Sequence, residues 1–248
     1  MSNKPETDES ISKKYGVSIR EPKQSPVGIT VFLPGTSLGV FGPKLENYES
    51  TIDVLLEMNQ FVIGFNQLSP NPLNSQGSHN KMAESVRDAV AAICALNKYP
   101  NLENKGYCIV GHSLGGKVAL MVAAKFDKEN VDRVLALDPV DDNDPQFTTN
   151  PPKINLGVAS ASIYLRQSAR GMIGVSKERN AEAIKKAFPD KFKDDVQFVF
   201  DAKAAHMSYT DETNEASAET RKDFQAFIRN KLFFDCVDQI KLQSKSRL

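Results

Sequence analysis

Residues 107–126, YCIVGHSLGGKVALMVAAKF, place a GxSxG pentapeptide directly between two apolar segments. Tyr107–Val110 is a short apolar run typical of a buried strand, and Leu114–Phe126 is long enough for a helix. A serine between a strand and a helix is typical of a nucleophile elbow, in which flanking glycines allow the two elements to approach closely. We therefore expect Ser113 at a tight turn with its hydroxyl accessible; the alternative is a glycine-rich turn that contains a serine by chance.

Outward from this segment, short apolar runs alternate with segments whose apolar residues recur at helical spacing. An unbroken alternation of this kind predicts an α/β protein with a mostly parallel sheet and helices on both faces. The predicted strands are Ile29–Leu33, Phe61–Phe65, Tyr107–Val110, Arg133–Leu137, Ser162–Leu165 and Val196–Phe200. The predicted helices are 45–56, Met82–Leu96, Leu114–Phe126, Ala181–Phe188 and Phe224–Leu232.

The ends of the chain and its length indicate one domain. Residues 1–14 are polar and predict a flexible N-terminal arm, and Tyr15–Arg20 alternates as an outer strand would. A length of 248 residues is common for a single α/β domain, and no interdomain linker is visible. We therefore expect a single domain over residues 15–248.

Composition excludes several classes of function. The 31 basic and 31 acidic side chains cancel, so the chain has no overall positive field for nucleic acid. The longest apolar run, Ala89–Leu96, is too short to cross a bilayer, which predicts a soluble protein. The three cysteines, Cys94, Cys108 and Cys236, are widely spaced, so we expect neither a disulfide framework nor a metal site.

The N-terminal segment predicts the compartment. The first 25 residues mix basic and acidic side chains and contain no apolar core, unlike a secretory signal or a transit peptide. We therefore expect an intracellular protein, cytoplasmic or plastid. The net charge of zero gives little repulsion between molecules, so we expect a monomer or a weak homo-oligomer. No cofactor is expected.

A serine nucleophile needs a base, and the chain has three histidines. His112 belongs to the elbow itself, and His79 precedes the serine, whereas elbow enzymes place the base after the last strand. His206 follows the last predicted strand by six residues, in a loop at the carboxyl edge of the sheet. We predict His206 as the base.

The base needs an acid that fixes its tautomer and stabilises the imidazolium. The usual loop, after Leu165, contains no carboxylate before Glu178. Asp138 directly follows the preceding apolar strand and is our first candidate, with Asp201, at the end of the last strand, as the competitor.

The oxyanion of an acyl-transfer intermediate needs two backbone N–H donors. Leu114 supplies one at the helix start, and Thr36 is the first candidate for the second, with Ser37 behind it, because Pro34 has no N–H. Apolar residues in two loops would surround the serine and favour a substrate with an apolar alcohol or acyl group. The alternative is that these residues pack on neighbouring helices. The candidate substrate-binding residues are Ser37, Leu38, Phe41, Met172 and Ile173.

Four segments together resemble the α/β-hydrolase superfamily, and within it the chlorophyllase group. LPGTSL at 33–38, GHSLGGK at 111–117, LDPVD at 137–141 and the pair His206-Met207 are similar to that group's oxyanion, elbow, acid and histidine segments. The resemblance implies an α/β-hydrolase fold and a triad of Ser113, Asp138 and His206. It also implies hydrolysis of the phytyl ester of chlorophyll to chlorophyllide and phytol. The alternatives are a carboxylesterase, lipase or thioesterase for other apolar esters, and a noncatalytic ligand-binding protein of the same fold.

Overall fold

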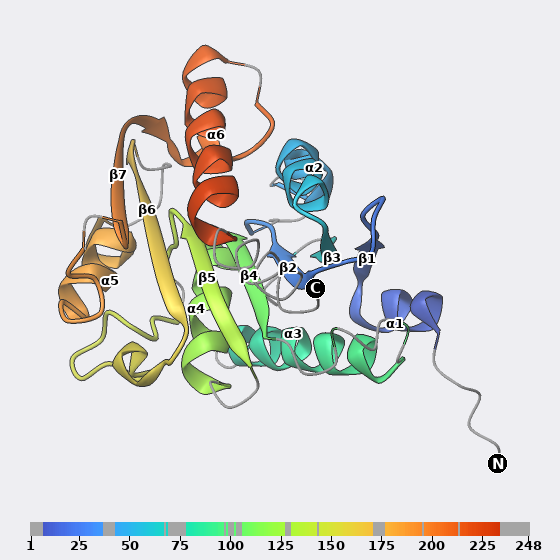
Figure 1. The fold of residues 1–248 in the computed structure, drawn as a ribbon. Helices are drawn as coiled ribbons and strands as arrows, with labels where there is room; N and C mark the ends of the chain where they lie inside the picture. Colours follow the sequence, from blue (N-terminus) through green and yellow to red (C-terminus); the bar gives the residue numbers. More distant parts are fainter. Residues whose placement is uncertain are drawn as a thin grey trace, which may run out of the picture.

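The computed structural model describes most of the chain, namely residues 7–36, 43–66, 68, 78–96, 98, 102, 106–126, 130–142, 144–170, 177–194, 196–212 and 214–233. A seven-stranded sheet in the order β1-β3-β2-β4-β5-β6-β7 forms the centre (Figure 1). The strands are β1 (Val17–Arg20), β2 (Gly28–Leu33), β3 (Gln60–Phe65), β4 (Tyr107–His112), β5 (Val131–Leu137), β6 (Ser162–Arg170) and β7 (Phe198–Ala205).

All neighbouring strands except the β1–β3 pair run parallel. The carboxyl ends of β2 to β7 therefore meet at one edge of the sheet, which is where ligands bind in open α/β folds. The mostly parallel sheet and the alternation of strands and helices agree with the sequence-based prediction, and β1 forms the predicted outer strand.

Helices cover both faces of the sheet (Figure 1). One face packs on α1 (Asp8–Tyr15), α3 (Ser78–Ala95), α4 (Leu114–Lys125) and α5 (Ala181–Ala187). The other packs on α2 (Glu49–Glu57), α6 (Glu215–Phe227) and the π-helical turn η7 (Ile228–Leu232). Short 3-10 turns complete the described helices: η1 (Leu45–Tyr48), η4 (Leu156–Val158), η5 (Lys177–Arg179) and η6 (His206–Tyr209).

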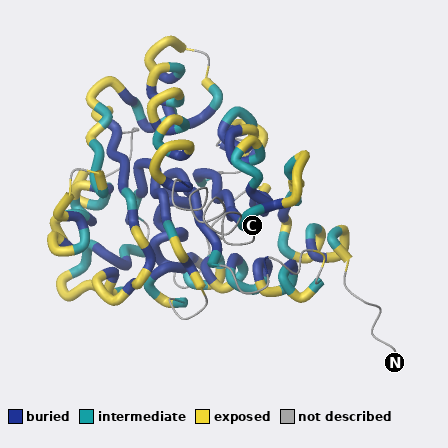
Figure 2. Tube along the Cα trace, viewed as in Figure 1, coloured by how far each residue is buried: buried dark blue, intermediate teal, exposed yellow. Residues whose placement is uncertain are grey.

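The central strands are mostly apolar because both of their faces are buried. In β2, Ile29, Val31 and Leu33 pack in the layer of α3 and α4. Phe32 between them packs in the layer of α2 and α6. Figure 2 shows this burial concentrated in the central strands, with exposed residues on the outer sides of the helices. Such strands read in sequence as continuous apolar runs.

The prediction of a flexible arm over residues 1–14 is wrong from Asp8 onward, where α1 begins. Thr7 and Ser10 form a capping box at its start, and Gly16 ends it with a left-handed φ of 66°. Ile11 is fully buried and belongs to the layer of α3 and α4. Apolar periodicity gave little signal for the helix, because Ile11 is its one fully buried residue and Tyr15 at its end is only partly buried against the same layer.

Two strands extend further than predicted. Apolar runs end at Leu165 and Phe200, but backbone pairing of β6 with β7 continues through Ser168 with Asp201 and reaches Arg170 with Ala205. Because hydrogen bonds between strands do not require apolar side chains, the apolar runs in the sequence end before the strands do. As a result His206 begins η6 directly at the end of β7, and does not lie in a long loop.

Candidate active site

Ser113 occupies a strained turn between β4 and α4. Its backbone angles are φ 56° and ψ −120°, a conformation that usually requires glycine. Three backbone hydrogen bonds hold it there: its N–H donates to the carbonyl of Leu137 at 2.9 Å, and its carbonyl accepts from the N–H groups of Lys117 at 3.1 Å and Val140 at 3.4 Å. The residue is 8% exposed. The geometry is that of the elbow predicted from the sequence.

The flanking glycines are required by close packing of strand, helix and turn. A Cβ at Gly111 would lie 2.3 Å from the Gly115 carbonyl oxygen, and one at Gly115 would lie 2.2 Å from the Leu33 carbonyl oxygen. Both distances are far inside van der Waals contact, and both obstacles are backbone atoms. The glycines therefore let α4 pack on β4 and on the end of β2.

Asp138 and His206 contact each other at the carboxyl edge of the sheet. His206 Nδ1 lies 2.7 Å from Asp138 Oδ2, and both side chains are buried. Asp138 directly follows β5 and has a left-handed φ of 45°. A carboxylate on Nδ1 fixes the tautomer that leaves Nε2 free to accept a proton.

Ser168 of β6 holds the Asp138 carboxylate from a second side. Its backbone N–H donates to Oδ1 at 3.1 Å, and its hydroxyl donates to Oδ2 at 2.5 Å. The N–H of Asp138 itself donates to the carbonyl of Arg166 at 2.7 Å. Side chain and backbone of Asp138 are therefore both anchored to β6.

Asp201, the competing acid, has other partners. It forms a buried ion pair with Arg166, whose Nε lies 2.8 Å from Oδ2, and it accepts a hydrogen bond from the Tyr209 hydroxyl at 2.6 Å. Burial and the charge of Asp201 raise the pKa of Tyr209 well above its usual value, so the hydroxyl keeps its proton. The structure thus brings Asp138 to His206 and places Asp201 under η6, in contact with the residue that closes this turn.

The turn predicted to supply the oxyanion donors lies against the elbow. Leu114 is the first residue of α4, and its N–H belongs to the unpaired helix N-terminus. A Cβ at Gly35 would lie 3.4 Å from Ser113 Cβ, which places the turn after β2 beside Ser113. Thr36 follows and pairs with Leu68 in an isolated parallel bridge.

The predicted substrate-binding residues all lie outside the described residues. These are Ser37, Leu38, Phe41, Met172 and Ile173. Among the residues that the structure describes, no group of three or more His, Cys, Asp or Glu side chains could hold a metal ion. In the same part of the chain, no helix is long and apolar enough to span a membrane.

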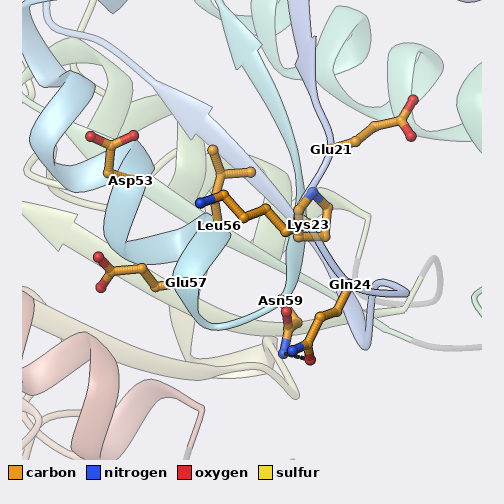
Figure 3. A pocket seen from close by; sticks show the side chains of 8 residues that line it. Glu21, Lys23, Gln24, Asp53, Leu56, Glu57 and Asn59 are labelled. Atoms are coloured by element: carbon orange, nitrogen blue, oxygen red, sulfur yellow. Dashed lines mark hydrogen bonds between the residues drawn. The ribbon is translucent and has the colours of Figure 1, made fainter.

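A surface pocket of about 480 Å³ lies at the opposite edge of the sheet, where β2 and β3 begin (Figure 3). Two of its three carboxylates already have partners, since Glu21 pairs with Lys98 and Glu57 with Arg229. The lining residues are Glu21, Pro22, Lys23, Gln24, Asp53, Leu56, Glu57 and Asn59. The pocket is thus separate from Ser113, which lies at the carboxyl edge.

Sequence reasoning missed three polar side chains around the site. Ser168 contacts Asp138, as described above, while Tyr48 and His112 contact each other. The position of His112 directly before Ser113 was a usable signal for a buried role. Nothing in the sequence pattern marks Tyr48, which reads as one apolar position of a helix.

Known proteins share this architecture. The family profile described as PGAP1-like alpha/beta domain matches residues 55–163, from the end of α2 to the second residue of β6. No curated protein sequence matches the chain significantly.

Solved structures resemble the chain over most of its length. TT1662 from Thermus thermophilus has a TM-score of 0.57 at 14% identity, covering 86% of this chain and 92% of that one. An alpha-beta serine hydrolase homologue from Coxiella burnetii has a TM-score of 0.57 at 17% identity, with 87% and 90% covered. XC6422 from Xanthomonas campestris, a member of a/b serine hydrolases without lid, has a TM-score of 0.53 at 14% identity, with 86% and 88% covered.

The chain therefore has the α/β-hydrolase fold, as its sequence predicted. Identities of this size establish the fold and leave the reaction to be argued from the site. Neither the family profile nor these structures points to the chlorophyllase group.

Proposed function

We propose that this protein is a serine hydrolase of carboxylic esters, with Ser113 as nucleophile, His206 as base and Asp138 as the orienting acid. The observation that carries the proposal is the 2.7 Å contact of His206 Nδ1 with Asp138 Oδ2, at the sheet edge where the strained Ser113 turn stands. A buried carboxylate–imidazole pair beside an elbow serine is the arrangement that activates a hydroxyl.

In the first half-reaction, Ser113 Oγ attacks the ester carbonyl carbon while its proton passes to His206 Nε2. The carbonyl oxygen becomes an oxyanion, for which the N–H groups of Leu114 and Thr36 are the proposed donors. The C–O bond to the alcohol then breaks, and the alcohol leaves with the proton from His206. An acyl-serine remains.

In the second half-reaction, water replaces the alcohol. His206 takes a proton from the water, whose oxygen attacks the acyl carbon. The bond between the acyl carbon and Ser113 Oγ then breaks as His206 returns the proton to Oγ. The carboxylic acid is released and the serine is restored. Asp138 keeps its charge throughout and stabilises the imidazolium. The mechanism requires no cofactor.

For the substrate, the phytyl ester of chlorophyll is the finer proposal. It is supported by the similarity of LPGTSL, GHSLGGK and LDPVD to chlorophyllase segments. Two residues depart from those segments, since Leu114 stands in place of an arginine and Thr36 in place of an aromatic residue. Both lie beside the nucleophile, so the departures bear on substrate choice and leave the triad intact.

The test compares wild type with Ser113→Ala on chlorophyll a and on a short-chain p-nitrophenyl ester. Wild type should hydrolyse ester and react with a fluorophosphonate at Ser113. The variant should lose at least about 10³-fold in kcat/KM and all labelling. Ester turnover that survives in Ser113→Ala would contradict the mechanism.

The two substrates separate the remaining alternatives. Serine-dependent release of chlorophyllide supports the pigment substrate. Serine-dependent cleavage of the small ester alone leaves a carboxylesterase, lipase or thioesterase. A wild-type protein that neither turns over ester nor reacts with fluorophosphonate is a noncatalytic binding protein.

A further inference from the structure

A row of three buried hydrogen bonds joins the segments that carry the proposed chemistry. The backbone N–H of Gly35 donates to the Tyr48 hydroxyl at 3.1 Å. That hydroxyl lies 2.6 Å from His112 Nδ1, and His112 Nε2 lies 2.8 Å from the backbone carbonyl oxygen of His206. We call Tyr48 and His112, with these contacts, the Tyr48–His112 bridge.

The direction of each hydrogen bond follows from what each group can do. A backbone N–H can only donate and a carbonyl can only accept, so Gly35 donates to Tyr48 and the His206 carbonyl must receive a proton from His112 Nε2. In neutral His112 the other nitrogen, Nδ1, is then an acceptor. The Tyr48 hydroxyl therefore donates to Nδ1, and all donors in the bridge point from Gly35 toward His206.

The electrostatics of the site support this assignment. Burial, followed by the neighbouring His206, lowers the pKa of His112 well below its usual range, so the ring is neutral. Burial also raises the pKa of Tyr48 well above its usual value, which keeps the hydroxyl protonated. The rings of His112 and His206 are 4.7 Å apart between centroids. A positive charge on His112 would therefore oppose the imidazolium that the proposed mechanism forms on His206.

We propose that Tyr48 and His112 are positioning residues that align the oxyanion turn and the base with the nucleophile. The inference rests on the proposed function of Ser113 and His206. Asp138 fixes the imidazole of His206, while the bridge fixes its backbone. The bridge also engages the Gly35 N–H, so this N–H is not available to an oxyanion.

One test reads the bridge without any substrate. Long-range ¹H–¹⁵N spectra of labelled wild type distinguish the two neutral imidazole tautomers from the imidazolium. His112 should stay in the single Nε2–H neutral form between pH 8 and pH 5.5, and Tyr48→Phe should broaden or split its signals. An Nδ1–H tautomer or an imidazolium at His112 in wild type would overturn the proposal.

A second test reads catalysis. Tyr48→Phe removes one oxygen and keeps the ring, which packs on Phe32 at 4.9 Å between centroids. It should lower kcat by about 10-fold and change KM by less than about twofold, as expected for loss of hydrogen bonds that align reacting groups. The matched control is Tyr164→Phe in the same layer of the core, where the ring packs on Phe227, and its kcat should stay within about twofold of wild type.

The double variant tests whether the two residues act as one unit. His112→Asn cannot reach the His206 carbonyl, and we expect it to lower kcat by about 10- to 100-fold. Adding Tyr48→Phe to it should cost less than about a further twofold, because the bridge is already broken. The inference would be overturned if the kcat losses of the two single variants multiplied in the double variant. It would also be overturned if Tyr48→Phe had the same kcat as Tyr164→Phe. Ester turnover that persists in Ser113→Ala would instead refute the proposed function. The tautomer of His112 would then still decide whether the bridge exists.

Discussion

At the scale of single residues, two carboxylates at the same sheet edge have different surroundings. Asp138 contacts His206 and two donors of Ser168. Asp201 contacts the guanidinium of Arg166 and the hydroxyl of Tyr209. One carboxylate is thus placed to act on an imidazole, and the other neutralises a buried cation. Substituting each by its amide should separate these two roles.

Asp138→Asn should lower kcat by up to about 10⁴-fold, because an amide favours the wrong histidine tautomer. Asp201→Asn should chiefly destabilise the fold, by about 3–5 kcal/mol, because it leaves the Arg166 charge buried without a counterion. Ester kinetics and urea unfolding of both variants provide the measurements. The assignment is wrong if Asp201→Asn abolishes turnover in a folded protein while Asp138→Asn does not.

At the scale of elements, a buried ion pair ties the connection after β5 to helix α4. Lys117 Nζ lies 3.0 Å from Asp141 Oδ1, with both side chains at 0% exposure. The Asp141 carboxylate also accepts the backbone N–H groups of Gln146, Phe147 and Thr148 at 2.8 to 2.9 Å. The segment that follows Asp138 is therefore folded around the Asp141 carboxylate, and the lysine paired with it lies four residues after Ser113 in the chain.

Lys117→Met should destabilise the protein by about 3–5 kcal/mol, because Asp141 would keep its charge without its cation. Thermal and urea unfolding measure the loss. Lys125→Met is the matched control on the same helix, since this lysine is exposed and its Nζ donates to Asn80 at 2.9 Å. Equal stability of the two variants would mean that the backbone donors alone sustain the Asp141 carboxylate.

At the scale of the whole molecule, two buried histidines make unfolding depend on pH. Burial, followed by the charge of Lys117, lowers the pKa of His79 to about 4, and its Nδ1 has no hydrogen-bond partner among the described residues. His112 is likewise held neutral by burial. The ordinary histidine pKa of the unfolded chain is about 6.5. Below about pH 6.5, these two histidines therefore bind protons in the unfolded state but not in the folded state.

The stability supplied by these histidines is complete above about pH 6.5 and declines as the pH falls toward 4, by up to about 1.4 kcal/mol per pH unit for each. Urea unfolding at pH 7.5 and pH 5.0 should show this decline. His79→Gln should reduce it by roughly half, since the His112 share remains. A free energy of unfolding that is equal at both pH values would contradict the assigned neutral states.

Much of this architecture could be predicted from the sequence, because apolar periodicity reports which faces are buried. The elbow at Ser113 and the order of strands and helices follow from that pattern. The pattern is silent about polar partners, which depend on packing between distant segments. Tyr48 reaches His112 across 64 positions, and Ser168 reaches Asp138 across 30, so neither contact has a local signature. The α1 helix was missed for a related reason, since only one of its residues, Ile11, is fully buried.

Because Ser113 has a left-handed backbone conformation, selection for the amount of folded protein and selection for activity should favour different residues at this position. A non-glycine residue in such a conformation costs about 1–3 kcal/mol, so Ser113→Gly would relieve strain and remove the hydroxyl together. A mutational library screened only for the amount of folded protein would therefore tolerate or favour glycine at this position, while rejecting side chains at Gly111 and Gly115. Because Ser113 is the proposed nucleophile, we expect only a screen for catalytic activity to retain the serine.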